Sequence, residues 1–557
     1  MKAALPDAET AAVLVRPCPD PKFGDYQTNA LMALAKARKM NPRQLATAVV
    51  ARLQLGDLCE KVDVAGAGFL NFRLKPSALG QVLTSAARGE HLFFEKASQP
   101  RTVVLDFSSP NVAKPMHVGH IRSTILGDSL ARTLRLLGHK VITDNHIGDW
   151  GTQFGKLTVG WKHHLNPSAL KADPIAEMER LYKLVNAASE SDRAVLEEAR
   201  QELVKLQRGD EENLRIWREM IALSQVQFDT IYGRLGVKFD HTLGESFYNP
   251  CLSALVQELR NKGIARESEG AIAAFFEDIP QLKGSPALIQ KSDGAFNYTT
   301  TDLATLQHRL ETWHPDAVVY VTDGRQQLHF QQIFALFGRW HPEAKMKLAH
   351  VWFGSILGED GKPFKTRSGE TIKLADLLDE AEERALKVVT EKSPALPEAQ
   401  RKEIARIVGI GAVKYADLLP NRQSDYEFSW DKLLALNGNT APYLQYAYAR
   451  IRSIFRKAET GFQPAQVSLA AVEEVALAKQ LLNFGLVLEA VAEDYRPNFL
   501  CNYLYELAGH FTSFYENCPV LKSEAGQRAS RLALCELTGR VLKQGLEVLG
   551  IETLEQM

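Results

Sequence analysis

Residues 109–140, SPNVAKPMHVGHIRSTILGDSLARTLRLLGHK, decide the fold of the central part of this chain. The apolar run TVVLDF (102–107) precedes them and predicts a strand, and Pro110 and Pro115 keep the connecting loop out of helical geometry. A helix then begins at about His120 and ends before Gly138. Its inward-facing residues are Leu126, Leu130, Leu134 and Leu137. We therefore expect the first strand and helix of a parallel sheet.

The same alternation of short apolar strands and helices continues along residues 99–394. The later strand candidates lie in KVITDNHIG, DAVVYVT and LAHVWFGSI. This order predicts an α/β, Rossmann-type doubly wound parallel sheet. A charged helical insertion occupies about 172–235, with Gly236 as its stop. Its predicted apolar stripe consists of Leu214, Trp217, Ile221 and Phe228.

Different patterns flank this central part. Residues 1–98 predict a smaller α/β domain, in which Asn41 and Pro42 start a helix and GFLNFRL forms a strand. The helix places Leu45, Val49 and Leu53 on one face, and the strand alternates Leu70, Phe72 and Leu74. Residues 395–557 lose the strand patterns and predict an all-α bundle. Its apolar positions include Leu500, Leu504, Leu507, Phe511, Phe514, Leu534, Leu537, Val541 and Val548.

Composition restricts the class of protein. A chain of 557 residues predicts about three domains, and 45% hydrophobic and 24% charged residues are typical of a soluble globular protein. No apolar run approaches the ~20 residues of a membrane span, and the N-terminus lacks a secretory signal pattern. The six scattered cysteines predict mostly buried thiols in a reducing cytosol and no zinc site. With a net charge of −1, local patches must hold any nucleic acid.

Two histidines around a glycine mark the candidate site. His117 and His120 lie between the end of a strand and the start of a helix, where open α/β sheets bind ligands and where helix termini favour phosphates. Gly119 leaves room for a flat ring to approach, and the imidazoles can donate hydrogen bonds to phosphate oxygens. The alternatives are that the pair caps the helix or binds a metal. The third ligand and the glutamate base of the usual zincin arrangement are missing, which disfavours the metal.

The motif HVGH resembles the HIGH motif of class I aminoacyl-tRNA synthetases. The longer run DFSSPNVAKPMHVGHIRSTILGDSLARTLRLLGHKVITDNHIGDWGTQFGKL resembles the arginyl-tRNA synthetases in particular. KFGDYQTNALMALAK and GFLNFRL resemble that family's N-terminal appended domain, VTDGRQQLHFQQIF and GKPFKTRSGETIKLADLL its second catalytic half, and GNTAPYLQYAYARIRSI and YLYELAGHFTSFYENCPVL its helical anticodon-binding domain. The terminal Met557 also matches the family.

The resemblance implies where ATP and arginine bind. His117 and His120 would contact the triphosphate, and Gly119 would lie under the adenine. The implied arginine pocket consists of Asp106, Ser109, Asn111, Tyr298, Asp302 and Gln326. A guanidinium has five donors and no acceptor, so carboxylate and amide oxygens suit it. The alternatives are a core aromatic for Tyr298 and a helix N-terminal charge for Asp302.

The second ATP-binding element departs from the class pattern K-M-S-K-S. The corresponding loop is GKPFKTRSGE, in which Lys365 comes first but Ser368 replaces the fourth-position lysine. In arginyl enzymes with this departure a lysine just before the HIGH motif is thought to compensate, and Lys114 matches it. We expect Lys362, Lys365 and Arg367 to form a mobile phosphate clamp. The alternative is a solvated surface loop.

A basic helix around PYLQYAYARIRSIFRKA predicts a nucleic-acid surface. Leu444, Tyr448, Ile451 and Phe455 fall on the side expected to face inward. The other side carries Tyr443, Gln445, Arg450, Arg452, Arg456 and Lys457. Interleaved aromatic and arginine side chains suit unstacked bases and their phosphates, although most basic helix faces are merely solvated. The resemblance favours tRNA contact.

The resemblance implies an ATP-dependent arginine–tRNA ligase. Its domains would be an N-terminal appended domain for the tRNA elbow (1–98), a catalytic domain (99–394) and an anticodon-binding domain (395–557). Lys114, His117, His120 and Lys365 would serve catalysis, with ATP and Mg²⁺ as co-substrate and no protein-bound zinc or organic cofactor. We expect a cytoplasmic monomer that binds tRNA(Arg) and no membrane. The alternatives are a non-enzymatic tRNA-binding paralogue and a nucleotidyltransferase for a small cofactor precursor.

Overall fold

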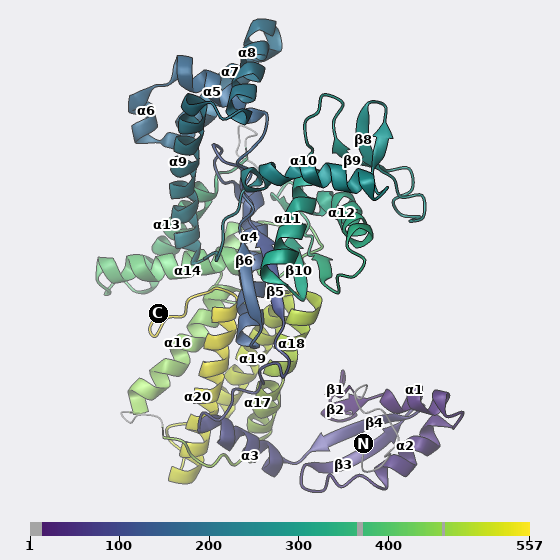
Figure 1. The fold of residues 1–557 in the computed structure, drawn as a ribbon. Coiled ribbons are helices and arrows are strands. Elements are labelled where there is room, and N and C mark those ends of the chain that lie inside the picture. Colours follow the sequence, from purple (N-terminus) through teal and green to yellow (C-terminus); the bar gives the residue numbers. More distant parts are fainter. Residues whose placement is uncertain (1–13, 365–370, 459–462) are drawn as a thin grey trace.

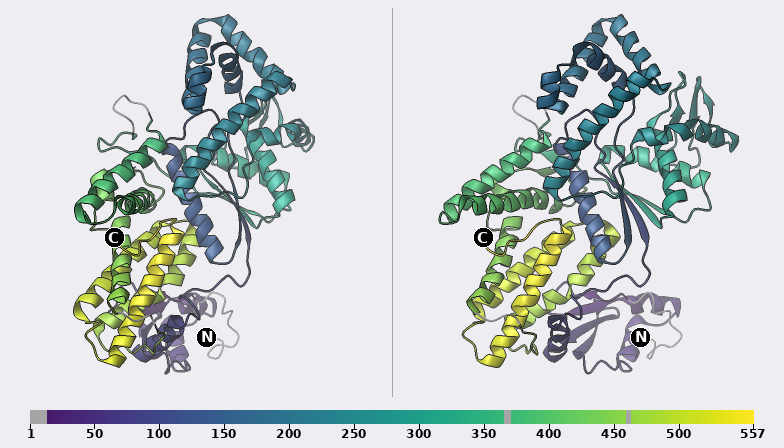
Figure 2. Two further views of the ribbon diagram at one scale, coloured as in Figure 1. Left: turned by 90° about the vertical axis from the view of Figure 1, so that its left-hand side faces the viewer. Right: turned by 60° about the vertical axis from the view of Figure 1, so that its left-hand side comes forward.

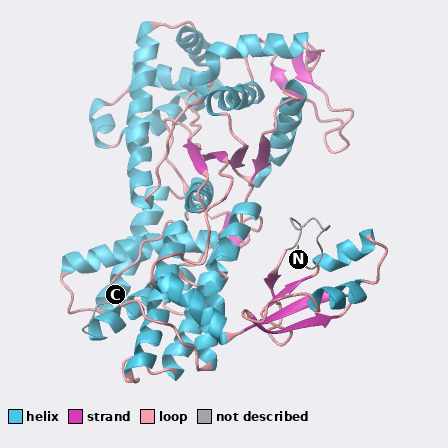
Figure 3. Ribbon diagram, turned by 60° about the horizontal axis from the view of Figure 1, so that its bottom comes forward, coloured by secondary structure: helices cyan, strands magenta, loops and turns pink. Residues whose placement is uncertain are grey.

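The structure is a computed structural model that describes residues 14–364, 371–458 and 463–557. A central α/β region lies in the middle of an elongated molecule, with a helical insertion at one end (Figure 1). The C-terminal helices and the small N-terminal domain lie next to each other at the opposite end (Figures 1 and 2). The C-terminal part consists mainly of helices (Figure 3).

The central sheet has four strands in the order β11-β10-β5-β6, and all three pairings are parallel. The strands are β5 (Thr102–Phe107), β6 (Lys140–Asp144), β10 (Ala317–Val321) and β11 (Lys347–His350). Alternate strand residues enter two different cores, because Val103 and Leu105 pack on one face and Val104 on the other. Helices cover both faces, which confirms the predicted doubly wound sheet.

Helix α4 (Val118–Leu136) packs against the first strand of this sheet. Its four predicted inward leucines are all buried. The helix begins two residues before the predicted start, because His117 acts as its N-cap. Gly127 allows the close packing: a Cβ there would lie 2.1 Å from Cγ of Phe107.

The insertion consists of α5 (Gln153–His164), α6 (Pro167–Ala172), α7 (Pro174–Ser191), α8 (Arg193–Gln207) and α9 (Glu211–Leu235). Gly236 ends α9 in the left-handed conformation, with φ of 63°, as predicted. In the predicted apolar stripe only Phe228 is fully buried, and the other three residues lie at its margin. The rest of the buried stripe consists of Ile216, Met220 and Ile231, which the sequence analysis did not single out.

Helices α10 (Glu245–Asn261), α11 (Tyr298–Trp313) and α12 (Gln327–Trp340) cover the other face of the sheet. Between α10 and α11 the chain forms a small antiparallel sheet, which the sequence patterns did not predict. Its strands are β7 (Arg266–Ser268), β8 (Ala271–Ala274) and β9 (Ala287–Gln290). Three or four residues are too short a run to show periodicity.

The N-terminal domain is an antiparallel sheet with two helices. Its strands are β1 (Arg16–Pro17), β2 (Tyr26–Thr28), β3 (Cys59–Ala65) and β4 (Phe69–Leu74), and its helices are α1 (Ala30–Ala37) and α2 (Pro42–Val50). Asn41 caps α2 by accepting hydrogen bonds from the backbone N–H groups of Arg43 and Gln44, as the sequence predicts. Helix α3 (Pro76–Ala87) follows and packs against the C-terminal helices.

The C-terminal bundle buries every leucine, valine and phenylalanine that its periodicity selected in 500–548. Its helices are α13 (Leu374–Lys392), α14 (Glu398–Leu418), α15 (Trp430–Leu433), α16 (Ala441–Ala458), α17 (Val472–Leu482), α18 (Phe484–Asp494), α19 (Asn498–Asn517) and α20 (Ala525–Val548). The prediction of helices alone is wrong at β13 (Tyr426–Glu427), which pairs with β12 (Ile356–Leu357). By length and composition Val472–Asp494 could cross a membrane, but half of this stretch is buried in the bundle.

Ion pairs and hydrogen bonds help to hold the parts of the molecule together. The N-terminal domain binds the bundle, where Nζ of Lys479 lies 2.6 Å from Oδ1 of Asp25 and the Tyr26 hydroxyl donates to Asn483. Figure 2 shows the two parts side by side. A second contact joins α4 to α14 through a fully buried ion pair, with Nε of Arg122 3.0 Å from Oδ1 of Asp417. Of the six cysteines, Cys59, Cys501, Cys518 and Cys535 are buried, Cys18 is half-buried and Cys251 is exposed.

Candidate active site

A cavity of about 400 Å³ opens at the carboxyl ends of β5 and β10. The structure brings the six residues of the expected arginine pocket together on its wall. They are Asp106, Ser109, Asn111, Tyr298, Asp302 and Gln326. They come from the end of β5 and the loop after it, the first turns of α11 and the 3₁₀ turn η2 (Gly324–Gln326). Their meeting in one cavity follows from the parallel sheet, whose strand ends share one edge.

Asp106 is buried and already paired on the protein side. Its Oδ2 lies 2.6 Å from Nη2 of Arg309, which also lies 2.7 Å from Oδ2 of Asp144. The hydroxyl of Ser109 donates to the other oxygen of Asp106 at 3.1 Å. The three charged groups leave one net negative charge beneath the cavity. Sequence reasoning missed Arg309, whose sole signal was a charged residue on a helix that covers the sheet.

Tyr298 and Asp302 occupy the first turns of α11, one helical turn apart. Tyr298 is 61% exposed, so the alternative of a core aromatic is wrong. Oδ2 of Asp302 lies 2.6 Å from Nε2 of His329, a residue of α12 that also lines the cavity. Asp302 is therefore more than a charge at a helix terminus, since its carboxylate contacts the His329 side chain of another helix on the cavity wall.

Other lining residues were not singled out from the sequence: His146, Gly148, Glu245, Thr301, Tyr320, Thr322, Arg325, His329 and Phe330. They lie at the end of β10, in the segments after β6 and β10, or in the first turns of the helices α10, α11 and α12. Their position at strand ends and helix starts was the available signal. Among them Glu245 is unusual, because burial, opposed by His146 and reinforced by Asp302 and Asp149, raises its pKa to about 7.

The histidine pair caps α4. Nδ1 of His117 accepts a hydrogen bond from the backbone N–H of Gly119 at 3.0 Å, and Nδ1 of His120 accepts one from the backbone N–H of His117 at 3.0 Å. The capping alternative is thus correct for the local structure. Because each Nδ1 accepts, each neutral ring carries its proton on Nε2, which stays available as a donor.

Burial favours the neutral form of both imidazoles. Burial, helped by Lys114, lowers the pKa of His117, and burial, helped by His117, lowers the pKa of His120 to about 3. The ring centroids are 4.0 Å apart. Two neutral N–H donors at a helix N-terminus can bind an anion without adding a titrating charge. Gly119 is required here, since a Cβ would lie 2.8 Å from Cε1 of His117.

Lys114 is exposed in the loop before the histidines. Its Nζ lies 5.3 Å from the ring centroid of Tyr182 in α7, and its charge reaches His117. Lys362 is also exposed. Lys365 and Arg367, with Ser368, lie outside the described residues. The structure therefore places two of the expected phosphate-binding cations and not the other two.

The expected division of α16 into a buried and an exposed side is partly correct. Leu444, Tyr448 and Ile451 are buried as predicted, and Phe455 is half-buried. The placement of Gln445 on the exposed face is wrong: its side chain is fully buried, and its amide donates to the carbonyls of Ile407 and Glu552. Packing against α14 and the C-terminal segment requires a polar residue there, because those carbonyls need donors.

Carboxylates, a backbone carbonyl and an aromatic ring contact the remaining arginines of this face. Arg452 is ion-paired with Glu536 and Glu555, at 3.1 and 3.0 Å. Arg456 donates to the carbonyl of Glu555, and Arg450 lies 4.4 Å from the ring centroid of Tyr515. Tyr443 contacts Tyr505 edge-on, with ring centroids 5.6 Å apart. Any RNA contact here therefore competes with intramolecular partners.

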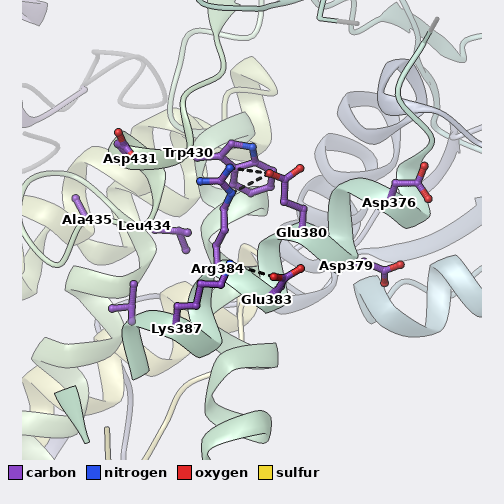
Figure 4. A pocket seen from close by; sticks show the side chains of 11 residues that line it. Asp376, Asp379, Glu380, Glu383, Arg384, Lys387, Trp430, Asp431, Leu434 and Ala435 are labelled. Carbon is purple, nitrogen blue, oxygen red and sulfur yellow. Dashed lines mark hydrogen bonds and ion pairs between the residues drawn. The ribbon is translucent and has the colours of Figure 1, made fainter. Parts of the chain in front are cut away.

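A larger cavity of about 750 Å³ lies between α13 and α15, away from all of these residues. Figure 4 shows acidic side chains along it, with Arg384 beneath Trp430. Arg384 and Lys387 are paired with Glu380 and Glu383. This cavity holds none of the expected site residues and is not the candidate active site.

A doubly wound sheet whose first helix is capped by two histidines, with a polar cavity at the carboxyl ends of its strands and a helical bundle after it, is the arrangement of a class I aminoacyl-tRNA synthetase. Three family models match the chain. They describe the arginyl-tRNA synthetase N-terminal domain over 1–74, the class I (R) tRNA synthetase catalytic domain over 81–430 and the DALR anticodon-binding domain over 444–557. The chain belongs to the arginyl-tRNA synthetase family, and its activity is the ATP-dependent ligation of arginine to tRNA.

Full-length relatives support this assignment. An arginine–tRNA ligase of Chromobacterium violaceum is 46% identical, with 100% of this chain and 97% of the relative covered. One from Klebsiella pneumoniae is 47% identical, covering 96% and 94%. Among solved structures, the arginyl-tRNA synthetase of Plasmodium falciparum has a TM-score of 0.83 at 30% identity, covering 100% and 97%. That of Thermus thermophilus also has a TM-score of 0.83, at 27% identity, covering 98% and 96%.

Proposed function

We propose that the cavity at the ends of β5 and β10 is the arginine site of this ligase. The observation that carries the proposal is that all six expected residues line this one cavity. Asp302 and the Asp106–Arg309–Asp144 cluster supply negative charge for the guanidinium, and exposed Tyr298 can cover the methylene stem. Ser109, Asn111 and Gln326 supply polar groups for the ammonium and carboxylate ends of the substrate.

We propose that ATP binds next to this cavity at the start of α4. The Nε2–H groups of His117 and His120 donate to the triphosphate, and the exposed backbone at Gly119 accommodates the adenine. Lys114, Lys362, Lys365 and Arg367 supply the cationic charge that the leaving pyrophosphate requires. Mg²⁺ enters with ATP as part of the substrate, and catalysis uses no resident zinc or organic cofactor.

In the reaction, the carboxylate of arginine attacks the α-phosphate and pyrophosphate leaves. A hydroxyl of the terminal ribose of tRNA then attacks the arginyl-adenylate, and AMP leaves. The protein's part is to align the reactants and to stabilise the growing charge on the leaving phosphates. Neutral histidines suit this task, since their donors are fixed by the helix cap and need no rearrangement.

We assign the three parts of the chain to three contacts with the reaction. Residues 1–98 recognise the tRNA elbow, residues 99–394 perform the chemistry and residues 395–557 bind the anticodon, with Tyr443, Arg450, Arg452 and Arg456 on the RNA-facing side of α16. We further propose that the enzyme works as a cytoplasmic monomer with no membrane partner. Sedimentation with and without tRNA tests the monomer.

The arginine site is tested by Asp302→Ala. We expect the KM for arginine to rise by roughly 10²-fold, because one charged hydrogen-bonding partner of the guanidinium is lost, while ATP saturation changes little. The measurement is pyrophosphate exchange with each amino acid, in the presence and absence of tRNA. An unchanged KM for arginine would remove Asp302 from the site. Exchange driven by another amino acid would refute arginine as the substrate.

A further inference from the structure

The loop between β5 and α4, which carries Lys114, is fastened to the helical insertion. The buried hydroxyl of Ser224 in α9 accepts a hydrogen bond from the backbone N–H of Ala113 at 2.9 Å and donates to the carbonyl of Met220. At the start of the loop, the hydroxyls of Ser108 and Tyr232 lie 2.8 Å apart. Helix α9 therefore holds this loop at two points.

The hydrogen bond from Ala113 fixes the backbone next to Lys114. Ala113 has a φ of 60°, a left-handed conformation that is unfavourable for a residue with a Cβ, so a partner on α9 is needed to hold it there. Ala113 and Met116 are both buried, and the exposed Lys114 lies between them. The backbone that carries Lys114 is thus anchored in the core, and the remaining freedom of this residue lies in its flexible side chain.

The side chain of Lys114 has an aromatic partner and no carboxylate partner. Its Nζ lies 5.3 Å from the ring centroid of Tyr182, within the ~6 Å typical of a cation–π contact. Tyr182 is half-buried in α7 and packs against the main core. Within the described parts of the chain, no carboxylate forms an ion pair with Lys114 and no group forms a hydrogen bond with the Tyr182 hydroxyl. The ring of Tyr182, and not its hydroxyl, therefore acts on Lys114.

An aromatic partner suits a cation that has to act on phosphates. A carboxylate would cancel the charge of the ammonium and would itself repel the leaving pyrophosphate. The face of a ring restrains the ammonium but leaves its positive charge in place. That charge also acts on the start of α4, where it adds to the effect of burial in lowering the pKa of His117. The ammonium of Lys114 thus contacts α7 while its electric field reaches the histidine pair.

We propose that Tyr182 is a positioning residue for adenylate formation, whose ring holds the ammonium of Lys114 in place for the departure of pyrophosphate. The inference rests on the proposed role of Lys114 at the leaving phosphates. A cation that is already in position needs little rearrangement when negative charge grows in the transition state. The helical insertion thereby takes part in the reaction, since α7 supplies the ring and α9 fixes the loop.

The first test is a double-mutant cycle between Tyr182 and Lys114, measured by single-turnover adenylate formation with tRNA present. Tyr182→Leu should slow this step about 2- to 30-fold, as expected for the loss of one cation–π contact, and should leave half-saturation by arginine unchanged. Tyr182→Phe keeps the ring and should stay close to the wild-type rate. In a Lys114→Met background, Tyr182→Leu should have no further effect, because the cation is gone. Leu184→Ala, on the exposed side of α7, should have no effect in either background.

These variants separate the inference from the proposed function. If Lys114→Met slows adenylate formation and Tyr182→Leu does not, Lys114 acts without Tyr182 and the inference is wrong. If Tyr182→Leu slows both backgrounds equally, Tyr182 does not act through Lys114, and the inference is again overturned. Normal activation in Lys114→Met would refute the proposed role of Lys114 itself, and the inference with it.

A second test preserves the shape of the side chain at position 182. Tyr182 is replaced by phenylalanine and by phenylalanines with one to three ring fluorines, which withdraw negative charge from the face of the ring. We expect adenylate formation to slow with each added fluorine in the enzyme that has Lys114, and to be insensitive to fluorination in the Lys114→Met background. A rate that does not depend on fluorination when Lys114 is present would overturn the proposal.

Discussion

His117 and His120 each use the two nitrogens of one ring for different purposes. Nδ1 fixes the start of α4 by accepting a backbone hydrogen bond, and this fixes the proton on Nε2. The cap therefore supports the proposed phosphate binding and is not an alternative to it. A residue that capped equally well, such as asparagine, would lack the reach of the second ring nitrogen.

Substitution of Lys114 tests whether the positive charge before the two histidines stabilises the leaving pyrophosphate. Lys114→Met should slow adenylate formation by ~10²–10³-fold, which corresponds to about 3–4 kcal/mol, as for loss of one preorganised donor. Arginine affinity should remain close to wild type, because Lys114 does not line the proposed arginine cavity. Single-turnover activation measures the effect, and Lys171→Met on α6 provides an exposed control. Normal activation in Lys114→Met would leave this residue a surface lysine. Ser368→Lys should restore part of the rate.

Helix α4 positions the histidines through its distance from β5. Gly127→Ala places a methyl group against the ring of Phe107, so we expect a loss of about 1–3 kcal/mol in the free energy of unfolding, typical of overpacking. The start of the helix should shift with it and slow adenylate formation. Chemical denaturation and single-turnover activation measure the two effects.

A matched control lies on another helix. Gly509→Ala on α19 meets no atom within 4 Å and should stabilise the protein slightly, through helix propensity alone. Phe107→Leu should recover part of the loss in Gly127→Ala, because the smaller side chain makes room. If Gly127→Ala were as stable and active as wild type, the packing of α4 on β5 would not set the position of the site.

Helices with a regular spacing of hydrophobic residues could be predicted from the sequence. Elements and side chains whose positions depend on tertiary contacts could not. The leucines of α4 and the apolar positions of α19 and α20 follow one helical face over several turns, so burial could be inferred from spacing. The strands β7 to β9 are too short to show a period. Gln445 looked exposed because it is polar, but two carbonyls from distant segments need its amide. Likewise, nothing local marks Arg309 as the partner of Asp106.

The candidate site could be predicted in outline for a related reason. Its first half lies on one continuous run around HVGH, and the resemblance supplied Tyr298, Asp302 and Gln326 from a distant part of the chain. Glu245 and His329 escaped notice because their importance arises from which groups face them across the cavity. Which groups face each other across the cavity depends on the folded sheet and cannot be inferred from sequence spacing.

At the scale of the whole molecule, one buried ion pair connects the catalytic sheet to the bundle. Arg122 lies two residues after His120, contacts Asp417 of α14 and donates to the carbonyl of Gly354. Arg122→Met leaves the carboxylate of Asp417 buried without its cation, which should destabilise the protein by about 3–5 kcal/mol. We expect calorimetry to show a lower melting temperature and a separation of bundle and sheet transitions.

The double variant Arg122→Met/Asp417→Leu decides what that ion pair does. Removing both charges should recover much of the stability, because no unpaired buried charge remains. If adenylate formation nevertheless stays slow, the ion pair positions the histidines relative to the bundle. If the rate recovers together with stability, its role is confined to folding.

The contact between the N-terminal domain and the bundle also has a consequence for synthesis of the chain on the ribosome. Tyr26 and its partner Asn483 are 457 residues apart. At a translation rate of 5–20 residues per second, the N-terminal domain waits roughly 20–90 s before its binding surface on α17 and α18 has been made. During that interval the small domain must hold its own sheet together with its docking face open to solvent. The growing chain is thus most exposed to misassembly at its first domain, which is completed early and covered last.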